Sequence, residues 1–336
     1  MPPPVRFGVV GVNHNHIYAQ TDLLVRAGAE LAGFFAEEAD LAAEYQRRYP
    51  QARRAGSRRE ILEDPRIHLI VSAAIPSDRA PLGVEAMRHG KDYMSDKPGM
   101  TSLEQLAEVR RVQAETKRIY SVCYSEHFET RSTVKAGELI AAGAIGKVIN
   151  TVGLGPHKLK NLPRPDWFYS RERTGGVLTD IASHQCEQFL FFADALDAKV
   201  VSATVANRAN PDRPELQDFG EMLLRTGDVT GYVRVDWFTP DGLPNWGDGR
   251  ITILGTEGYM ELRKYIDVAG QPGIDHLILV DAKGIHRIDC SQVELPYGRQ
   301  LIADVLDRTE TAIPQARCFK AMELALTAQA MAEGRA

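Results

Sequence analysis

The stretch VRFGVVGVNHNHIYAQ, from Val5 to Gln20, begins as a short apolar run and continues through a glycine into a helical pattern. A strand that turns at a glycine into a helix is how a dinucleotide-binding unit begins. In the usual fingerprint three glycines form the turn, admit the pyrophosphate and let the helix pack. Here Gly11 fills the first place, and Asn13 and His16 fill the second and third. Because asparagine tolerates positive φ, we predict a pyrophosphate turn with Asn13 in place of glycine.

The two histidines of this loop, His14 and His16, allow two other interpretations. They could bind zinc, but they lie in a turn, the sequence identifies no third ligand, and structural zinc sites usually have four protein ligands. They could also simply hydrogen-bond to the loop backbone. We expect no metal here and assign Val12, His14 and His16 to the cofactor loop.

A second expectation concerns the acid that recognises the adenosine ribose, roughly 20 residues after the glycines. Ala36 occupies that position, and Glu37 follows it. Glu37 can reach a ribose hydroxyl, and no arginine stands there to accept a 2′-phosphate. The sequence therefore favours NAD over NADP.

The first third of the chain alternates short apolar runs with amphipathic helical patterns, which predicts βαβ units and a parallel sheet. The expected strands are 6–10, 30–35, 68–75, 91–94 and 119–124. The expected helices are 17–27, 39–49, 80–89 and 101–116, the last opened by Thr101 and Glu104 at the spacing of a capping box.

The remainder places many strands after one long helix, which predicts a mostly antiparallel sheet. The expected helices are 132–142, 176–193 and 318–330, and the expected strands are 147–152, 199–207, 219–225, 230–238, 250–254, 259–262 and 277–280. We therefore predict an α/β protein with a doubly wound N-terminal domain at 1–124. An α+β domain with a large open sheet is expected at 125–336, its last helix packing back on the first domain.

Composition excludes several classes of function. The 336 residues carry a net charge of −5, which leaves no basic footprint for nucleic acid. The longest apolar runs have the length of strands, so no membrane span is expected. Four widely spaced cysteines suggest buried thiols rather than a disulfide framework. With no leader pattern at the N-terminus, a cytoplasmic location is expected.

Two further motifs carry candidate chemistry. In YMSDKPGM (93–100), Lys97 lies at the carboxyl end of a predicted parallel strand, and Pro98 keeps its backbone away from helix. In TGGVLTDIASHQCEQFLFF (174–192), Asp180 and His184 are four residues apart on one predicted helix, so they share a face. A carboxylate beside an imidazole suits acid/base work near neutral pH. Read singly, the first motif equally suits an ordinary Lys-Pro turn and the second a surface Asp–His pair.

Together these motifs resemble the Gfo/Idh/MocA family of NAD(P)-dependent oxidoreductases over nearly the whole chain. The resemblance rests on the first strand and loop, on Asp96-Lys97-Pro98 in place of Glu-Lys-Pro, and on the Gly-Gly…Asp…His segment. It implies a Rossmann domain followed by an open-sheet domain, in a homodimer or homotetramer. It also implies that Lys97, Asp180 and His184 are catalytic. His184 or Lys97 would take the hydroxyl proton, while Lys97 stabilises the developing alkoxide.

The chain departs from the family pattern at three places. Asp96 is one methylene shorter than the family glutamate, Ile75-Pro76 precedes Arg79 where Thr-Pro and a later histidine are common, and Glu126-His127 replaces an arginine. The residues assigned to the cofactor are Gly11, Val12, Asn13, His14, His16, Glu37, Ile75, Pro76, Arg79, Asp96, Lys97 and Pro98. Those assigned to the substrate are Lys97, His127, His157, Trp167, Asp180 and His184.

Two long loops, 153–170 and 241–250, combine tryptophan with polar residues, which suits the C–H faces and hydroxyls of a carbohydrate. Trp167 could equally pack its loop on the sheet or fill a subunit interface. The function expected is an NAD-dependent dehydrogenase of a sugar, polyol or glycoside. Two alternatives are a glycoside-cleaving enzyme with transient oxidation and a ligand-sensing protein that keeps the fold without turnover.

Overall fold

The alternating first third of the chain forms the parallel sheet that its pattern predicts. The computed structural model describes residues 4–159 and 164–335. Its six-stranded sheet has the order β3-β2-β1-β4-β5-β6, the order of a dinucleotide-binding doubly wound fold. The strands are β1 (Arg6–Val10), β2 (Glu30–Phe35), β3 (Arg53–Arg54), β4 (Leu69–Ser72), β5 (Asp92–Asp96) and β6 (Tyr120–Cys123). β4, β5 and β6 are buried at every residue, as strands covered on both faces should be.

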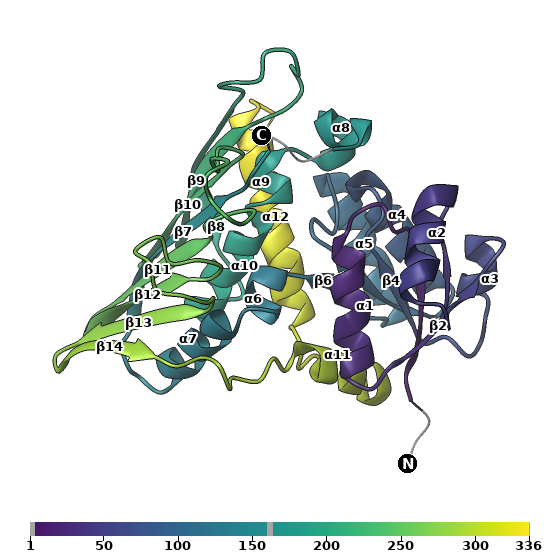
Figure 1. Ribbon diagram of the computed structural model, residues 1–336, viewed down its shortest axis with the longest axis horizontal. Helices are drawn as coiled ribbons and strands as arrows, with labels where there is room; N and C mark the ends of the chain where they lie inside the picture. The colour runs from purple at the N-terminus through teal and green to yellow at the C-terminus, as the bar shows by residue number, and fades with distance from the viewer. Residues whose placement is uncertain (1–3, 160–163, 336) are drawn as a thin grey trace. The chain divides into compact units, whose positions relative to one another are not determined.

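Helices connect these strands and pack on the sheet (Figure 1). They are α1 (His16–Arg26), α2 (Ala39–Arg48), α3 (Arg58–Leu62), α4 (Pro76–Arg88), α5 (Leu103–Thr116) and α11 (Tyr297–Asp307). The sequence did not indicate α3 or α11. The cap of α5 also lies one residue later than expected, because Ser102 Oγ accepts from Gln105 N at 3.2 Å. Gln105 Oε1 in turn accepts from Thr101 N at 2.8 Å.

The second sheet has eight strands in the order β14-β13-β12-β11-β7-β10-β9-β8. Neighbouring strands are antiparallel except β7 and β10, which are parallel, so the predicted mostly antiparallel sheet is confirmed. The strands are β7 (Val148–Pro156), β8 (Lys199–Ala206), β9 (Phe219–Thr226), β10 (Val229–Asp236), β11 (Arg250–Gly255), β12 (Gly258–Arg263), β13 (His276–Asp281) and β14 (Gly284–Ile288).

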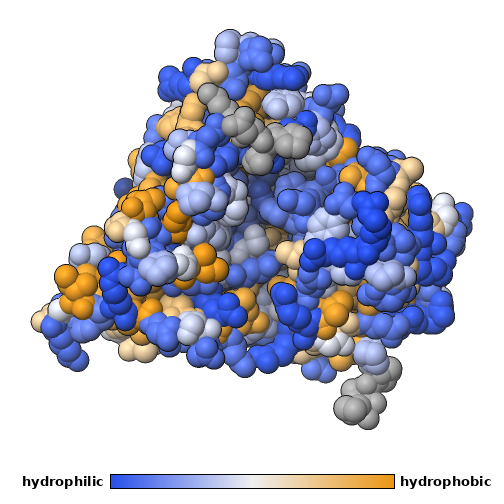
Figure 2. Space-filling model, viewed as in Figure 1, coloured by the Kyte–Doolittle hydropathy of each residue, from blue (hydrophilic) through white to orange (hydrophobic). Residues whose placement is uncertain are grey.

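Helices cover one face of this sheet, and the other face is exposed (Figure 1). The helices that pack on its strands include α7 (Arg131–Ala141), α9 (Val177–Asp180) and α10 (Ser183–Phe192). The other helices of this part of the chain are α6 (Ser125–Phe128), η1 (Asp166–Tyr169), α8 (Arg171–Thr174) and α12 (Gln315–Ala332). Strand residues alternate between the faces, so Ile251 and Ile253 are buried whereas Leu254 is 40% exposed. In Figure 2, apolar residues interrupt the hydrophilic surface along the left margin, where Figure 1 draws this sheet.

Within the described residues the chain divides into two units. The first contains 4–123 and 296–319, and the second contains 124–159, 164–295 and 320–335. The chain therefore returns to the first unit through α11 before α12 continues into the second. None of the described helices is both long and apolar enough to cross a membrane.

Candidate functional site

The turn after β1 is built around Gly11, whose φ of +79° lies in the left-handed region. A Cβ on Gly11 would lie 2.6 Å from the Cβ of Ala74, so a side chain would force the loop away from the end of β4. Two backbone bonds fix the turn: Gly11 N donates to Phe35 O at 3.0 Å, and His14 N donates to Ala73 O at 2.9 Å. A glycine turn followed by a helix N-terminus is the cradle that a pyrophosphate needs.

The expectation that Asn13 imitates glycine by adopting positive φ is wrong. Among the described non-glycine residues, positive φ occurs at Lys117, Asp194, Asp275 and Arg308. Asn13 uses its side chain instead, donating from Nδ2 to Glu38 Oε1 at 2.7 Å. The end of β2 is thus joined to the loop through Glu38, one residue beyond the predicted Glu37, which is exposed. The role of Glu37 toward the ribose stays a prediction.

His14 and His16 both lie against Asp96, at the end of β5. His16 Nδ1 is 3.0 Å from Asp96 Oδ1, and His14 Nδ1 is 3.6 Å from Asp96 Oδ2. The backbone N–H of His16 donates to Nδ1 of His14 at 3.3 Å, so the neutral His14 ring carries its proton on Nε2. Burial, together with the charge of His16, holds the pKa of His14 well below 6.5, which keeps that ring neutral.

The same three side chains could hold a metal ion, because their ligand atoms lie within 4.8 Å of one another. The sequence-based statement that no third ligand is identifiable is therefore wrong, since Asp96 supplies one. Arg79 Nη2, however, lies 3.0 Å from Asp96 Oδ2. Its charge, together with the positive end of the α1 dipole, disfavours a second cation. The electrostatics of the cluster suits an anion better than a metal ion.

Arg79 joins this cluster to the loop that carries Lys97. Arg79 is fully buried, and its guanidinium donates to Ala74 O at 2.7 Å, to Pro98 O at 3.2 Å and to Lys97 O. Burial alone would raise the pKa of Asp96, but His16 and Arg79 hold it well below its usual range. Lys97 is 5% exposed, and its peptide bond to Pro98 is cis. The main chain of Lys97 is therefore held by a buried side chain as well as by the proline.

Ile75 and Pro76, also assigned to the cofactor, begin α4. Ile75 is the N-cap residue, and Pro76 occupies the first turn, where its missing N–H costs no hydrogen bond. Val12, between the glycine and the histidines, is buried. Pro76 and Val12 thus shape the backbone of the loops rather than presenting polar groups.

The single helix expected over 176–193 is wrong. The structure has α9 and α10, separated by Ile181 and Ala182, so Asp180 ends one helix and His184 lies in the first turn of the next. Both intervening residues keep α-type backbone angles, so periodicity alone could not reveal the break. Asp180 and His184 are therefore not an i,i+4 pair on one helix. His184 is 2% exposed, and its ring centroid lies 6.3 Å from that of Tyr124.

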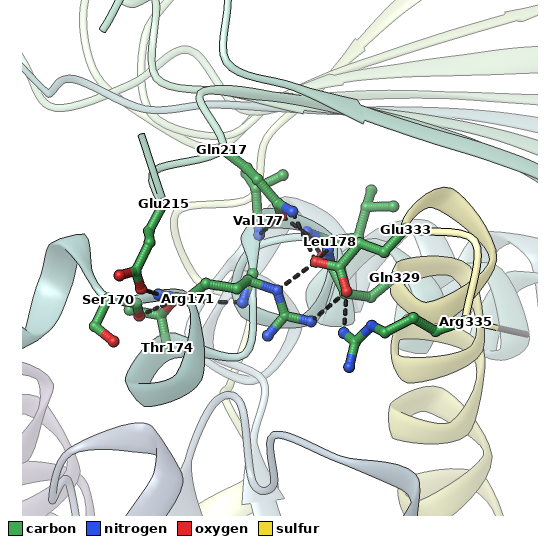
Figure 3. A network of polar contacts seen from close by, with 11 residues as sticks. Ser170, Arg171, Thr174, Val177, Leu178, Glu215, Gln217, Gln329, Glu333 and Arg335 are labelled. Atoms are coloured by element: carbon green, nitrogen blue, oxygen red, sulfur yellow. Dashed lines mark hydrogen bonds and ion pairs between the residues drawn. The ribbon is translucent and has the colours of Figure 1, made fainter. Parts of the chain in front are cut away.

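A polar network fixes the start of α9 without a side-chain N-cap (Figure 3). Val177 N donates to Gln217 Oε1 at 3.2 Å, and Leu178 N donates to Gln329 Oε1 at 3.0 Å. Glu333 Oε1 accepts from both Gln217 and Gln329 at 2.8 Å. These side chains satisfy N–H groups that the helix itself leaves open. The helix that ends at Asp180 is therefore anchored at its other end by residues of α12 and of the segment before β9.

The double glycine that precedes α9 is required by this packing. Gly175 and Gly176 have φ of +84° and +88°. A Cβ on Gly176 would lie 2.5 Å from Cδ of Gln329. The Gly-Gly pair that carries the family resemblance thus places the network of Figure 3 directly against the backbone.

A buried network around Glu126 is the main feature that the sequence analysis missed. Lys264 Nζ donates to Glu126 Oε2 at 2.7 Å and to Gln188 Oε1 at 2.7 Å, and Gln185 Nε2 donates to Glu126 Oε2 at 3.0 Å. Burial alone would raise the pKa of Glu126, but Lys264 and then His184 lower it to about 2. Glu126 was visible as a charge-reversed departure from the family, whereas Lys264 gave no signal.

His127, predicted to contact substrate, lies in a different contact. Its Nδ1 is 2.9 Å from Glu187 Oε2, its ring centroid is 4.0 Å from that of Phe191, and it is 7% exposed. These neighbours suit a packed imidazole that completes the core under α10. A substrate role for His127 stays a prediction.

His157 lies among aromatic rings, 5.3 Å from Trp237 and 4.6 Å from Trp246 between centroids. Arg164 lies over the ring of Trp237 at 5.2 Å, and burial lowers its pKa although Asp180 raises it. The ring centroid of Trp167, which was predicted to contact substrate, lies 6.3 Å from that of Phe168 in η1. Trp237 and Trp246, rather than Trp167, therefore surround His157; residues 160–163 of the same loop lie outside the described residues.

A small pocket lies beside Asp180, and Phe168, Gly176, Gln217 and Trp237 are among its lining residues. The aromatic rings and Asp180 thus reach one cavity of the second unit. Lys97 belongs to the first unit, and Asp180 and His184 belong to the second. Their joint catalytic role stays a prediction.

Two family models match the chain. The model described as an oxidoreductase family with an NAD-binding Rossmann fold matches residues 5–124, and the model of the GFO/IDH/MocA C-terminal domain matches residues 133–261.

Curated relatives match part of the chain. It is 25% identical over 187 residues to D-xylose dehydrogenase of Paenarthrobacter nicotinovorans, covering 54% of this chain and 47% of that protein. It is 25% identical over 230 residues to scyllo-inositol 2-dehydrogenase (NAD(+)) of Bacillus subtilis (strain 168), covering 67% and 61%. The matches thus span about half to three fifths of these relatives.

Solved structures match nearly the whole chain. A crystal structure described as that of a putative oxidoreductase from Erwinia carotovora atroseptica SCRI1043 is 44% identical, covers 98% of both chains and has a TM-score of 0.95. Levoglucosan dehydrogenase in complex with NADH and levoglucosan is 15% identical, with 99% of this chain and 98% of that one covered and a TM-score of 0.83. That second likeness concerns the fold alone.

Proposed function

The chain belongs to the Gfo/Idh/MocA family of oxidoreductases with an NAD-binding Rossmann fold, and on that premise we propose that it oxidises or reduces a sugar, polyol or glycoside. The hydride would pass between NAD and a carbon that bears a hydroxyl or keto oxygen. The observation that carries the proposal is the loop of Lys97, which follows β5. Fully buried Arg79 holds this loop by donating to the backbone oxygens of Lys97 and Pro98. A lysine so fixed can act on a reacting oxygen.

The residues of the first unit fit a dinucleotide. Gly11 lets the loop pass close to Ala74, where a Cβ would clash, and α1 begins directly after the loop, so a pyrophosphate finds a helix N-terminus there. The carboxylates of Glu37 and Glu38 at the end of β2 suit the ribose hydroxyls of NAD and would repel a 2′-phosphate. When bound, NAD supplies the carbon that accepts or returns the hydride.

Two side chains of this chain can take the proton, and a third orients one of them. In the oxidation direction, the substrate hydroxyl gives its proton to His184 or Lys97 as its C–H bond breaks and a carbonyl forms. The positive charge of Lys97 stabilises the oxygen while negative charge develops on it. Asp180 orients one of these two bases. The expected cytoplasmic location and homo-oligomeric state stay predictions.

A ligand-sensing role is the competing proposal, and one observation favours it. Asn13 and Glu38 are bonded to each other at 2.7 Å, so the loop departs from the glycine fingerprint in structure as well as in sequence. Mass spectrometry of the protein as purified, looking for retained dinucleotide, is the first test. Retained or bindable NAD without turnover of any polyol would favour the sensor.

Replacement of Lys97 by alanine separates the two proposals. For an enzyme, Lys97→Ala should lower kcat by about a hundredfold to ten-thousandfold while NAD still binds. Turnover is followed by nicotinamide absorbance with D-xylose, scyllo-inositol and levoglucosan, and NAD affinity by calorimetry. Lys147→Ala, at an exposed lysine of the second unit, is the control and should keep full activity. Equal turnover by Lys97→Ala and wild type would refute the catalytic assignment.

A further inference from the structure

Toward the residues that the structure describes, Glu126 uses one of its two carboxylate oxygens. Both donors that reach it, Lys264 Nζ at 2.7 Å and Gln185 Nε2 at 3.0 Å, go to Oε2. Oε1 is buried and receives no donor from the part of the chain that the structure describes. Glu126 itself is 2% exposed. Oε2 thus accepts two hydrogen bonds while buried Oε1 accepts none. Because buried polar atoms are normally hydrogen-bonded, Oε1 calls for a donor from outside this network.

Gln185 shows the same asymmetry. Its amide nitrogen is committed to Glu126, and its Oε1 is buried without a donor among the described residues. The side chain is held in place by β7, because Cβ atoms on Gly153 and Gly155 would lie 3.0 Å from Cγ and Nε2 of Gln185. A side chain at either glycine would press on Gln185, so the two glycines give this side chain room against β7.

The two open acceptors adjoin the residue proposed as a base. Gln185 follows His184 in α10, and Gln188 Nε2, whose partner oxygen binds Lys264, donates to the backbone oxygen of His184 at 3.1 Å. One hydrogen-bonded lattice therefore joins the turn that presents His184 to the side chains of Glu126, Lys264, Gln188 and Gln185. All of these residues belong to the second unit.

The charges of the lattice select the kind of donor. Glu126 and Lys264 form a pair whose side chains are 3% and 1% exposed, so the lattice is neutral as a whole and attracts neither cation nor anion strongly. A ligand carboxylate would add an anionic oxygen beside Glu126 and would bring no donor. A neutral hydroxyl brings a donor without a charge, which is what an open acceptor requires.

We infer that Glu126 Oε1 and Gln185 Oε1 accept hydrogen bonds from two substrate hydroxyls, so the second unit selects neutral polyhydroxylated molecules over sugar acids. This inference rests on the proposed function and names the substrate class of that same site. The two residues act in binding: they touch hydroxyls that do not react, and they position the reacting carbon.

The test compares substrates with and without the contacted hydroxyls. Wild type, Gln185→Met and the double variant Glu126→Leu/Lys264→Met are assayed with NAD on D-xylose, its monodeoxy analogues and D-glucuronate. The double variant removes the charged pair together, because a single replacement would leave a buried unpaired charge. Each variant should raise KM for D-xylose by about tenfold to a hundredfold and leave kcat much less changed. If D-xylose is not a substrate, the same series is run on scyllo-inositol.

The deoxy analogues distinguish recognition from general damage. An analogue that lacks the contacted hydroxyl should be a poor substrate for wild type. Replacing the acceptor residue should then raise the KM of that analogue little further, because the hydrogen bond is already missing. Arg263→Met, next to Lys264 but paired with Glu261 at 2.7 Å, is the control and should keep wild-type KM values. Thermal unfolding and NAD affinity verify that each variant is folded.

Each outcome decides the inference. Oxidation of the polyols by wild type, with unchanged KM values and unchanged deoxy penalties in both variants, would overturn the acceptor assignment and leave the proposed function intact. Better turnover of D-glucuronate than of D-xylose by wild type would overturn the selectivity. Failure of wild type to bind or oxidise any polyol would refute the proposed function, and the inference with it.

Discussion

Replacement of Arg79 by methionine should unfold the first unit at much lower denaturant than wild type needs. The guanidinium is fully buried and lies 3.0 Å from Asp96 Oδ2, where both side chains are 1% exposed. Methionine fills most of the space but leaves the carboxylate without its main counter-charge. It also leaves the carbonyls of Ala74, Lys97 and Pro98 without the donor they share.

The magnitude follows from burial. Removing one partner of a buried ion pair costs about 3–5 kcal/mol, because the other charge stays buried and uncompensated. His16, whose Nδ1 is 3.0 Å from Asp96 Oδ1, still contacts the carboxylate and offsets part of this cost. We therefore expect a loss near the lower end, about 3 kcal/mol at neutral pH. Arg88→Met on the same helix, whose guanidinium and partner Glu108 are 55% and 40% exposed, should change stability little.

The pH dependence has a definite sign. His16 and Arg79 depress the folded-state pKa of Asp96 against the effect of burial, so wild type gains stability above the ordinary carboxyl pKa of 3.8. That stability is lost as pH falls through the depressed value. In Arg79→Met the carboxyl pKa rises. The difference between wild type and variant should therefore be largest near neutral pH and shrink below pH 3.8.

The assay must report on the first unit. All three tryptophans, Trp167, Trp237 and Trp246, lie in the second unit, so tryptophan fluorescence follows that unit. Hydrogen exchange of the β4 and β5 amides in urea, resolved by mass spectrometry, follows the first. Arg79→Met should accelerate exchange in β4 and β5 far more than Arg88→Met does. Equal exchange in the two variants would refute the claim that Arg79 compensates a buried charge.

Two further predictions concern the loop and the lattice. Gly11→Ala should cost more than Gly28→Ala and should abolish NAD binding by calorimetry. Both glycines have positive φ, which costs an L residue about 1–2 kcal/mol. A Cβ on Gly11 would also clash with Ala74, whereas a Cβ on Gly28 would meet no atom within 4 Å. Because Lys264 holds the pKa of Glu126 at about 2 although burial raises it, wild type should lose stability as pH falls from 4.5 toward 2. Glu126→Leu/Lys264→Met should show a flatter acid titration of the tryptophan transition, and an unchanged slope would contradict the assignment.

Much of the fold is written locally in the chain. β1 and β2 have the bounds that their apolar runs predict, because a strand buried on both faces needs a continuous apolar segment. Helices α1 and α2 follow the 3.6-residue period in the same way and lie within one residue of their predicted bounds. Short elements such as α3, α6 and β14 were not predicted, because four or five residues are too few to show a helical or strand periodicity.

The candidate site was predictable only where a motif is itself local. Gly11, Lys97, Asp180 and His184 could be named because each belongs to a short recognisable segment. Their surroundings could not. The break between Asp180 and His184 keeps α-type backbone angles at both joining residues, so no periodic signal marks it.

The sequence by itself determined most of the longer strands and helices, the glycine turn and the family motifs, because these depend on residues close together in the chain. Only the tertiary structure decided which charges meet. Asp96 reaches His16 across 80 residues, and Lys264 reaches Glu126 across 138. Such pairs form where sheet order and helix packing bring distant segments together. A buried charge must find a partner there, whatever its distance along the chain.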